Sequence, residues 1–238
     1  MGLKSDIENR VSTVIDENYS ISDATVTPTR NSVTFGATAK KFFARALFID
    51  IRGSEDLLSS HTNITALKAH KAFLYAAAKC IRAEGGDPRS FNGDSILAFW
   101  AGMGDENAKK AVRAAMKIRY ALDEIVNPKL DQKYSETLNF GMGIGQGDIY
   151  VGKSGIAGDE NFQDLIWLGW SVYHAVRYGD KAKKPKAIWI SKNIWKSIKD
   201  DEKMTIGGDG KNMWVYADET FSFGTVRVYK TSYRWSIS

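Results

Sequence analysis

Two aspartates stand where strands are expected to end, and their type and spacing could support metal chemistry. Asp50 closes an apolar run that begins at Ala46, and Asp94 directly follows the Asn-Gly pair at residues 92–93. Asn-Gly between two apolar segments is the strongest short-range signal for a hairpin. If the two strands are neighbours in one sheet, their carboxylates meet at one edge and offer the oxygen ligands that Mg²⁺ and Mn²⁺ prefer. The sequence therefore predicts a metal site at Asp50 and Asp94.

The elements that must hold these carboxylates in place alternate between strands and long helices. Apolar residues at helical spacing predict helices over 3–19, 63–83, 104–126 and 170–178. Short apolar runs predict strands over 41–50, 89–91, 96–100, 138–145, 148–151, 162–168, 187–190, 225–232 and 233–237, with a turn at 146–147. Because several strand pairs are joined by tight turns, we predict an α+β fold with a mostly antiparallel sheet covered by helices, rather than a doubly wound parallel sheet.

Composition and charge limit the classes of protein that this chain can belong to. It has 238 residues, 43% of them hydrophobic, which is enough for a sizeable core. The longest apolar run, 72–78, is far shorter than the ~20 residues that span a membrane, and the first residues lack an export region. The net charge of +5 suits a polyanionic ligand, but the basic residues are scattered rather than gathered in a stripe. We therefore expect a cytoplasmic protein that has neither membrane nor nucleic acid as a partner.

The chain divides into an N-terminal helix and linker arm, residues 1–40, and one larger domain, residues 41–238. Residues 20–40 are polar and rich in Thr and Ser, so they are either a loose connector or an extended arm that passes over a partner subunit. The single cysteine, Cys80, lies in an Ala-rich helical segment and is expected to pack as a small apolar group.

Four motifs, taken together and in order, resemble the signatures of the class III nucleotidyl cyclase catalytic domain. They are Phe-Ile-Asp-Ile-Arg-Gly at 48–53, Gly-Asp and an apolar strand at 93–99, a Gly-rich segment at 141–152, and Gly-Trp-Ser-Val-Tyr-His-Ala-Val-Arg at 169–177. One such motif alone is weak, but four at plausible spacing are specific. The resemblance implies a ferredoxin-like fold, with residues 41–238 as the catalytic domain, and a head-to-tail homodimer.

The resemblance also assigns roles to individual residues. It implies that Asp50, Asp94 and the backbone carbonyl of Ile51 hold two divalent ions, Mn²⁺ or Mg²⁺, beside a nucleoside triphosphate. Arg177 of the other subunit would stabilise the charge of the transition state, so that both subunits contribute to each site. The family also has a cation near the C-terminus that binds the triphosphate, and the candidates here are Arg227 and Lys230.

Residues 53–54 add a candidate that does not depend on the resemblance. Gly53 and Ser54 begin a short helix directly after the first strand. The free N–H groups of a helix start can bind an anion such as phosphate. We therefore include both residues among the candidate nucleotide-binding positions.

The departures from the family pattern concern the base. Cyclases that use ATP carry a Lys where this chain has Ser90 and an Asp where it has Trp170; guanine readers carry Glu and Cys there. Tyr173 replaces the Asn that orients the ribose. Trp170, Tyr173 and Arg177 share one helix face, so their rings would narrow the base pocket to a size that suits a pyrimidine. Aromatic residues at this spacing are also typical of a core or a dimer interface.

Discrimination between bases requires a polar group that reads the base edge. Ser90, Arg89, Asn92 and Tyr173 are the candidates, and the sequence does not rank them. This pattern resembles the pyrimidine cyclases of bacterial antiphage defence, the Pycsar systems. It implies conversion of UTP to 3′,5′-cyclic UMP, a second messenger that a separate effector protein reads. Open alternatives are a cytidylate cyclase making cyclic CMP, an adenylate cyclase, a catalytically degenerate nucleotide-sensing domain, and another metal-dependent phosphoryl-transfer enzyme.

Overall fold

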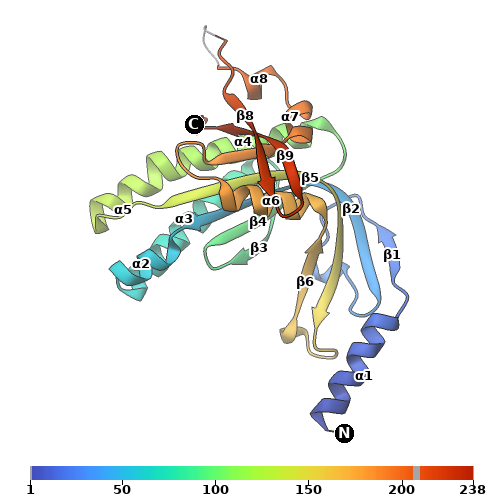
Figure 1. Ribbon diagram of the computed structural model, residues 1–238. Helices are drawn as coiled ribbons and strands as arrows, with labels where there is room; N and C mark the ends of the chain where they lie inside the picture. The colour runs from blue at the N-terminus through green and yellow to red at the C-terminus, as the bar shows by residue number, and fades with distance from the viewer. Residues whose placement is uncertain (1, 206–209, 238) are drawn as a thin grey trace.

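The computed structural model describes residues 2–205 and 210–237, which form one mixed sheet with helices on both faces (Figure 1). The helices are α1 (Leu3–Asp16), α2 (Ser54–Ser60), α3 (Asn63–Ala83), α4 (Asp105–Ala121), α5 (Asn127–Tyr134), α6 (Trp170–Lys181), α7 (Lys192–Ser197) and α8 (Asp200–Lys203), with the short helical turns η1 (Arg30–Ser32), η2 (Leu122–Val126) and η3 (Glu160–Phe162). The strands are β1 (Ser20–Asp23), β2 (Thr38–Arg52), β3 (Asp87–Asn92), β4 (Ser95–Ala101), β5 (Asn139–Gly155), β6 (Gln163–Leu168), β7 (Ile188–Ser191), β8 (Trp214–Phe221) and β9 (Gly224–Thr231).

The sheet is organised around two long antiparallel strands, β2 and β5. The main strand order is β3-β4-β2-β5-β7-β9-β8, while β1 pairs with β2 and β6 pairs with β5. The pairs β1–β2 and β5–β7 are parallel and the other pairs are antiparallel. The predicted α+β fold with a mostly antiparallel sheet is therefore confirmed.

The predicted hairpin turn at 146–147 is wrong, because β5 runs through it as one continuous strand. Gln146 lies opposite Arg45 and Gly147 opposite Ala44, in a ladder that joins β2 and β5 from Lys40 to Arg52. A chain reversal at Gly147 would have broken this pairing. The halves of β2 and β5 that carry β1 and β6 extend beyond the main sheet toward α1 (Figure 1).

The two faces of the sheet have different coverings. Helices α3 and α4 pack on one face, where Leu47 and Ile49 of β2 join Phe73 of α3 and Val112 of α4 in the main core. The other face carries α6, which packs chiefly on β5 and β2, and a smaller cluster that includes Phe42 and Phe99. The even-numbered residues of β2, Asp50 among them, lie on the face that carries α6, because side chains alternate along a strand.

Glycines on β5 allow α6 to lie directly against the sheet. A Cβ at Gly143 would lie 2.0 Å from the Ala175 carbonyl oxygen, and one at Gly145 would lie 2.4 Å from the Ser171 carbonyl oxygen. Such distances are far inside van der Waals contact, so only glycine permits this approach. The Gly-rich motif therefore serves to bring the backbones of β5 and α6 together.

Of the two alternatives for residues 20–40, the loose connector is wrong, and an arm that passes over a partner subunit stays a prediction. Residues 20–23 form β1, which pairs with β2, and Val33 is buried. The proposed boundary at residue 40 consequently falls inside β2. Helix α1 has no buried residue and lies at the far end of the sheet from α2 and α5 (Figure 1).

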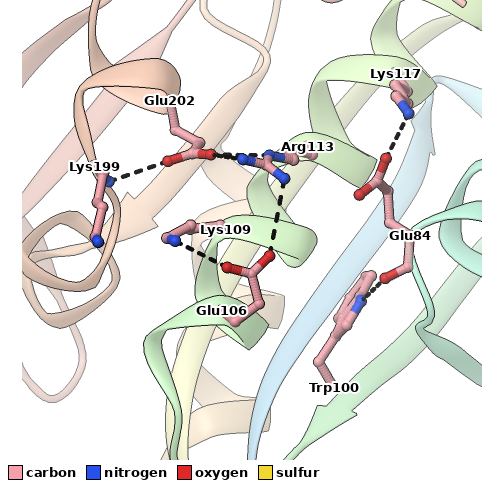
Figure 2. Close-up of polar contacts among 8 residues, drawn as sticks. All are labelled: Glu84, Trp100, Glu106, Lys109, Arg113, Lys117, Lys199 and Glu202. Carbon is pink, nitrogen blue, oxygen red and sulfur yellow. Dashed lines mark hydrogen bonds and ion pairs between the residues drawn. The ribbon is translucent and has the colours of Figure 1, made fainter.

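The C-terminal part also departs from prediction. Residues 214–221 form β8, which the sequence analysis missed, while 233–237 are not a strand. An ion pair attaches this part to α4: buried Glu202 of α8 accepts hydrogen bonds from Arg113 of α4 and from the Lys199 backbone N–H (Figure 2). Within α4, Lys109 pairs with Glu106. No helix in the described ranges combines the length and apolar character needed to cross a bilayer.

Candidate active site

The two predicted aspartates lie together at the end of β2. Asp50 is paired in the ladder with Ser95 of β4, and Asp94 occupies the turn that joins β3 to β4. The Asp94 carbonyl accepts a hydrogen bond of 3.1 Å from the Ile51 backbone N–H, which fixes the turn against β2. Gly93 has a φ of +64°, a conformation that glycine adopts without strain. The predicted hairpin is thus confirmed, and it places the two acidic residues side by side.

The surroundings of Asp50 destabilise its ionised form. Its side chain is only 18% exposed. Burial, followed by the charges of Asp94 and Asp180, raises the pKa of Asp50 to about 6, while the charge of Arg52 opposes the rise. A neighbouring carboxylate that raises the pKa of Asp50 also makes this a site at which a divalent cation is favourable.

Arg52 is a component of the site that the sequence analysis did not identify. Its Nη1 lies 3.2 Å from Oδ2 of Asp50, its Nε donates to the Ala182 carbonyl at 3.3 Å, and its Nη2 donates to the Gly179 carbonyl. Arg52 follows Asp50 by two positions on one strand, and this spacing could have revealed the pair. The side chain connects the end of β2 to the end of α6.

The residues present fit the predicted metal ions through the chemistry of their donors. Mg²⁺ and Mn²⁺ prefer oxygen ligands, and Asp50 and Asp94 supply two carboxylates beside each other. Within residues 2–205 and 210–237, no group of three or more His, Cys, Asp or Glu side chains could hold a metal. Further ligands would therefore have to come from the backbone, from water or from the substrate, and the carbonyl of Ile51 stays a prediction.

Arg177 faces a cavity of about 620 Å³ on the outer side of α6. Its guanidinium lies 3.7 Å from Asp180 and over the ring of Tyr173, at 5.2 Å from the ring centre. The cavity is lined by Trp167, Leu168, Gly169, Trp170, Val172, Tyr173, Val176, Arg177, Ser222 and Phe223. This volume lies within the range of small-molecule sites. The predicted shared helix face of Trp170, Tyr173 and Arg177 is therefore present, whereas Asp50 and Asp94 do not line this cavity.

An aromatic cluster forms one wall of the cavity. The Trp170 ring packs edge-on against Tyr173 with centroids 5.6 Å apart, and Phe223 approaches Tyr173 to 5.4 Å and His174 to 5.0 Å. Trp170 is nevertheless 61% exposed. An exposed tryptophan at the rim of a cavity is available to stack on a ligand.

The remaining predicted nucleotide-binding residues lie on separate elements. Gly53 and Ser54 open α2 immediately after β2, with Gly53 in a left-handed conformation (φ +68°). Ser90 lies on β3 opposite Leu97, and Asn92 ends that strand with its carbonyl accepting from the Asp94 N–H at 2.7 Å. Their roles in nucleotide binding stay predictions.

The two candidate triphosphate-binding cations already have acidic partners. Arg227 of β9 donates to both carboxylate oxygens of Asp218, at 2.9 and 3.2 Å, and Lys230 pairs with Glu219 and lies over the Trp189 ring. Neither is among the residues that line the cavity. Their assignment remains a prediction, and each would have to exchange an ion pair for a phosphate.

Sequence reasoning also missed Ser222 and Phe223. They lie in the β8–β9 turn, and their contacts with α6 join residues nearly fifty positions apart, for example the 2.8 Å hydrogen bond between Ser222 and Tyr173. No local sequence pattern predicts such a contact. Because strand β8 was not predicted, the β8–β9 turn that carries both residues was not predicted either.

Comparison with known proteins places this arrangement in a family. No family model matches the chain. A uridylate cyclase from Xanthomonas perforans is 30% identical over 242 residues, covering 100% of both chains. A uridylate cyclase from Burkholderia cepacia is 25% identical over 241 residues, also covering 100% of both.

Solved structures agree with this chain in fold. The crystal structure of the guanylyl cyclase Cya2 matches with a TM-score of 0.66 at 20% identity, covering 82% of this chain and 94% of that chain. The adenylyl cyclase CyaB from P. aeruginosa matches with a TM-score of 0.64 at 21% identity, covering 81% and 95%. At such identities the likeness shows the common fold alone.

Proposed function

This chain belongs to the class III nucleotidyl cyclases, in the family of the uridylate cyclases, and on that premise we propose that it converts UTP to 3′,5′-cyclic UMP and diphosphate. The structural observation that carries the proposal is the proximity of the Asp50 and Asp94 carboxylates. A divalent cation between them would relieve their mutual repulsion. The choice of UTP is supported by the names of the full-length relatives.

The proposed reaction is an intramolecular transfer of the α-phosphoryl group. The ribose 3′-oxygen attacks the α-phosphorus in line, the bond from that phosphorus to the bridging oxygen breaks, and diphosphate leaves. Divalent ions held by Asp50 and Asp94 would lower the pKa of the 3′-hydroxyl and neutralise phosphate charge. Arg177 would contribute its fixed positive charge to the phosphoryl oxygens as negative charge accumulates there.

We propose that the two halves of each site come from two copies of the chain. Arg177 lines the cavity on the outer side of α6, while the acidic pair lies at the end of β2. In a head-to-tail homodimer, the Arg177 face of one copy meets the acidic pair of the other, so that two equivalent sites form.

The aromatic cluster supports a pyrimidine substrate. Trp170 and Tyr173 occupy positions at which the purine cyclases carry smaller polar residues, and Trp170 is exposed enough to stack on a base. A single-ring base would fit beside these side chains, and Ser90, Arg89, Asn92 or Tyr173 would read its polar edge. Cyclic UMP would then act as a second messenger in antiphage defence, made in the cytoplasm and read by a separate effector protein.

The decisive experiment offers the pure protein each of the four nucleoside triphosphates separately, with Mn²⁺, and identifies the products by mass. We expect cyclic UMP and diphosphate from UTP. Predominant cyclic CMP would shift the assignment to a cytidylate cyclase, and predominant cyclic AMP or cyclic GMP would refute a pyrimidine substrate. Saturable binding without any product would indicate a nucleotide sensor, and diphosphate without a cyclic product would indicate another phosphoryl-transfer enzyme.

A pair of variants tests the carboxylates in the same assay. Asp94→Ala should abolish turnover, because the acidic pair is broken. Asp148→Ala changes an exposed carboxylate on β5 that pairs with Lys41 at 2.9 Å, and it should retain activity. Turnover by Asp94→Ala would remove the metal role from this residue.

A further inference from the structure

The turn between β8 and β9 touches the proposed catalytic arginine through one intermediary. Ser222 in this turn lies 2.8 Å from the hydroxyl of Tyr173, oxygen to oxygen. Tyr173 lies one helical turn before Arg177, whose guanidinium covers the tyrosine ring at 5.2 Å from its centre. Ser222, Tyr173 and Arg177, with Asp180 at 3.7 Å from Arg177, therefore form a continuous series of contacts that leads from the β8–β9 turn onto α6.

Arg177 needs such support because it is exposed. Its side chain is 48% accessible, and a free arginine loses rotamer entropy when it is fixed in one orientation. A group that stabilises a transition state is effective only when it is already directed at the place where charge develops. The ring of Tyr173 provides that direction if the ring itself cannot turn.

The ring of Tyr173 is held from two sides. Trp170 packs edge-on against it with centroids 5.6 Å apart, and Phe223 approaches from the β8–β9 turn at 5.4 Å. These contacts fix the plane of the ring, and the hydrogen bond between Ser222 and Tyr173 fixes its hydroxyl end. The β8–β9 turn therefore supplies both an aromatic contact to the Tyr173 ring, from Phe223, and a hydrogen bond to its hydroxyl, with Ser222.

We propose that Ser222 is a positioning residue of the cyclase reaction, which acts through Tyr173 to orient the guanidinium of Arg177. The inference rests on the proposed function of Arg177. In this role the phenol of Tyr173 supports the guanidinium of Arg177.

The turn should remain in place when the Ser222 hydroxyl is removed, because other contacts anchor it. Lys181 of α6 donates to the Thr220 carbonyl at 2.8 Å and pairs with Glu219, and Phe223 retains its ring contacts. Ser222→Ala consequently removes one hydrogen bond without releasing the hairpin. Thr225→Val is the matched control, since Thr225 bonds Thr220 across the same hairpin at 2.9 Å and does not contact Tyr173.

Steady-state kinetics of the full chain test the proposal. Ser222→Ala should lower kcat about fivefold, the value of one ordinary hydrogen bond, with little change in KM. Ser222→Thr should restore the rate, and Thr225→Val should leave it unchanged. In a Tyr173→Phe background, Ser222→Ala should have no further effect, because the connection is already broken. Equal losses in both backgrounds, or equal losses for Ser222→Ala and Thr225→Val, would overturn the proposal.

A second measurement separates this proposal from the proposed function. The hydrogen bond with Ser222, and after it the neighbouring Arg177 guanidinium, lower the pKa of Tyr173, so a phenol absorbance titration, taken as the difference between wild type and Tyr173→Phe, should show a pKa below that of an ordinary tyrosine. Ser222→Ala should raise it and Thr225→Val should not. If the chain turned over no nucleotide while this pattern held, the proposed function would fail and the Ser222–Tyr173 connection would stand. An unchanged titration in Ser222→Ala would refute the connection itself.

Discussion

Replacing Asp50 by Asn should make the protein more stable while it removes the proposed activity. The carboxylate of Asp50 is partly buried near Asp94 and Asp180, and its pKa in the folded chain is about 6, against 3.8 for a free aspartate. Because the folded chain holds this proton more tightly than the unfolded chain, the stability due to Asp50 is complete below pH 3.8 and declines as the pH rises through about 6. An asparagine at this position does not ionise, so the unfolding free energy of Asp50→Asn should not show this decline.

The magnitude follows from the two pKa values. Their difference corresponds to about 3 kcal/mol of unfolding free energy in favour of Asp50→Asn at about pH 8, with about half of that gain at pH 5 and little at pH 4. For a chain of this length, about 3 kcal/mol corresponds to an increase in Tm of roughly 6–12 °C. The charge of Arg52 already reduces the pKa of Asp50, so its contribution is included in this value.

Denaturant unfolding at the three pH values measures the effect. Asp148→Asn, an exposed carboxylate that pairs with Lys41, is the control and should bring no gain. Excess Mn²⁺ should stabilise the wild type and not Asp50→Asn, because a ligand stabilises only the state that binds it. A gain that is the same at pH 4 and pH 8, or no gain at pH 8, would refute the assignment of repulsion and burial to Asp50.

Three further predictions concern the proposed dimer interface, the packing of α6 and the core. Mixing an Asp50→Ala chain with an Arg177→Ala chain should restore part of the cyclase activity, since one of the two sites in each mixed dimer is intact; no rescue in isolated mixed dimers would count against shared sites. Gly143→Ala should cost about 3 kcal/mol or more in unfolding free energy, because its Cβ would lie 2.0 Å from the Ala175 carbonyl oxygen, whereas Gly152→Ala, with its nearest contact at 3.8 Å, should be nearly neutral in the same denaturant titration. Burial raises the pKa of the Cys80 thiol to about 11, so maleimide should label it after denaturation and only slowly in the native chain at about pH 8; rapid native labelling would contradict this burial.

Local chemistry explains what could be predicted from the sequence. The hairpin at 92–94 follows from the turn preference of Asn-Gly, and the helix expected at 63–83 is present as α3 because its apolar residues keep helical spacing over several turns. Both depend on neighbours in the sequence. The position of Asp50 next to Asp94 followed from the same two local patterns.

Long-range contacts explain what was missed. The pair Gln146-Gly147 has residue types that are common in turns, but its pairing with β2 keeps it within a continuous strand. The segment 214–221 has a largely exposed, polar outer side, so its pairing with β9 had no clear apolar signature. Ser222 is bonded to Tyr173 across the fold, and only the three-dimensional arrangement could reveal that contact.

The glycines of β5 have a mechanical consequence for the enzyme. Because α6 touches the β5 backbone itself, and Arg52 holds its last turn to β2, we expect the helix and the central strands to move as a single rigid body. In the proposed homodimer, an adjustment of the distance between arginine and phosphorus during a catalytic cycle would then come from a sliding or rocking of one protomer against the other. A signal that activates the enzyme would accordingly be expected to change the contact between the two protomers and to leave the interior of each one undisturbed.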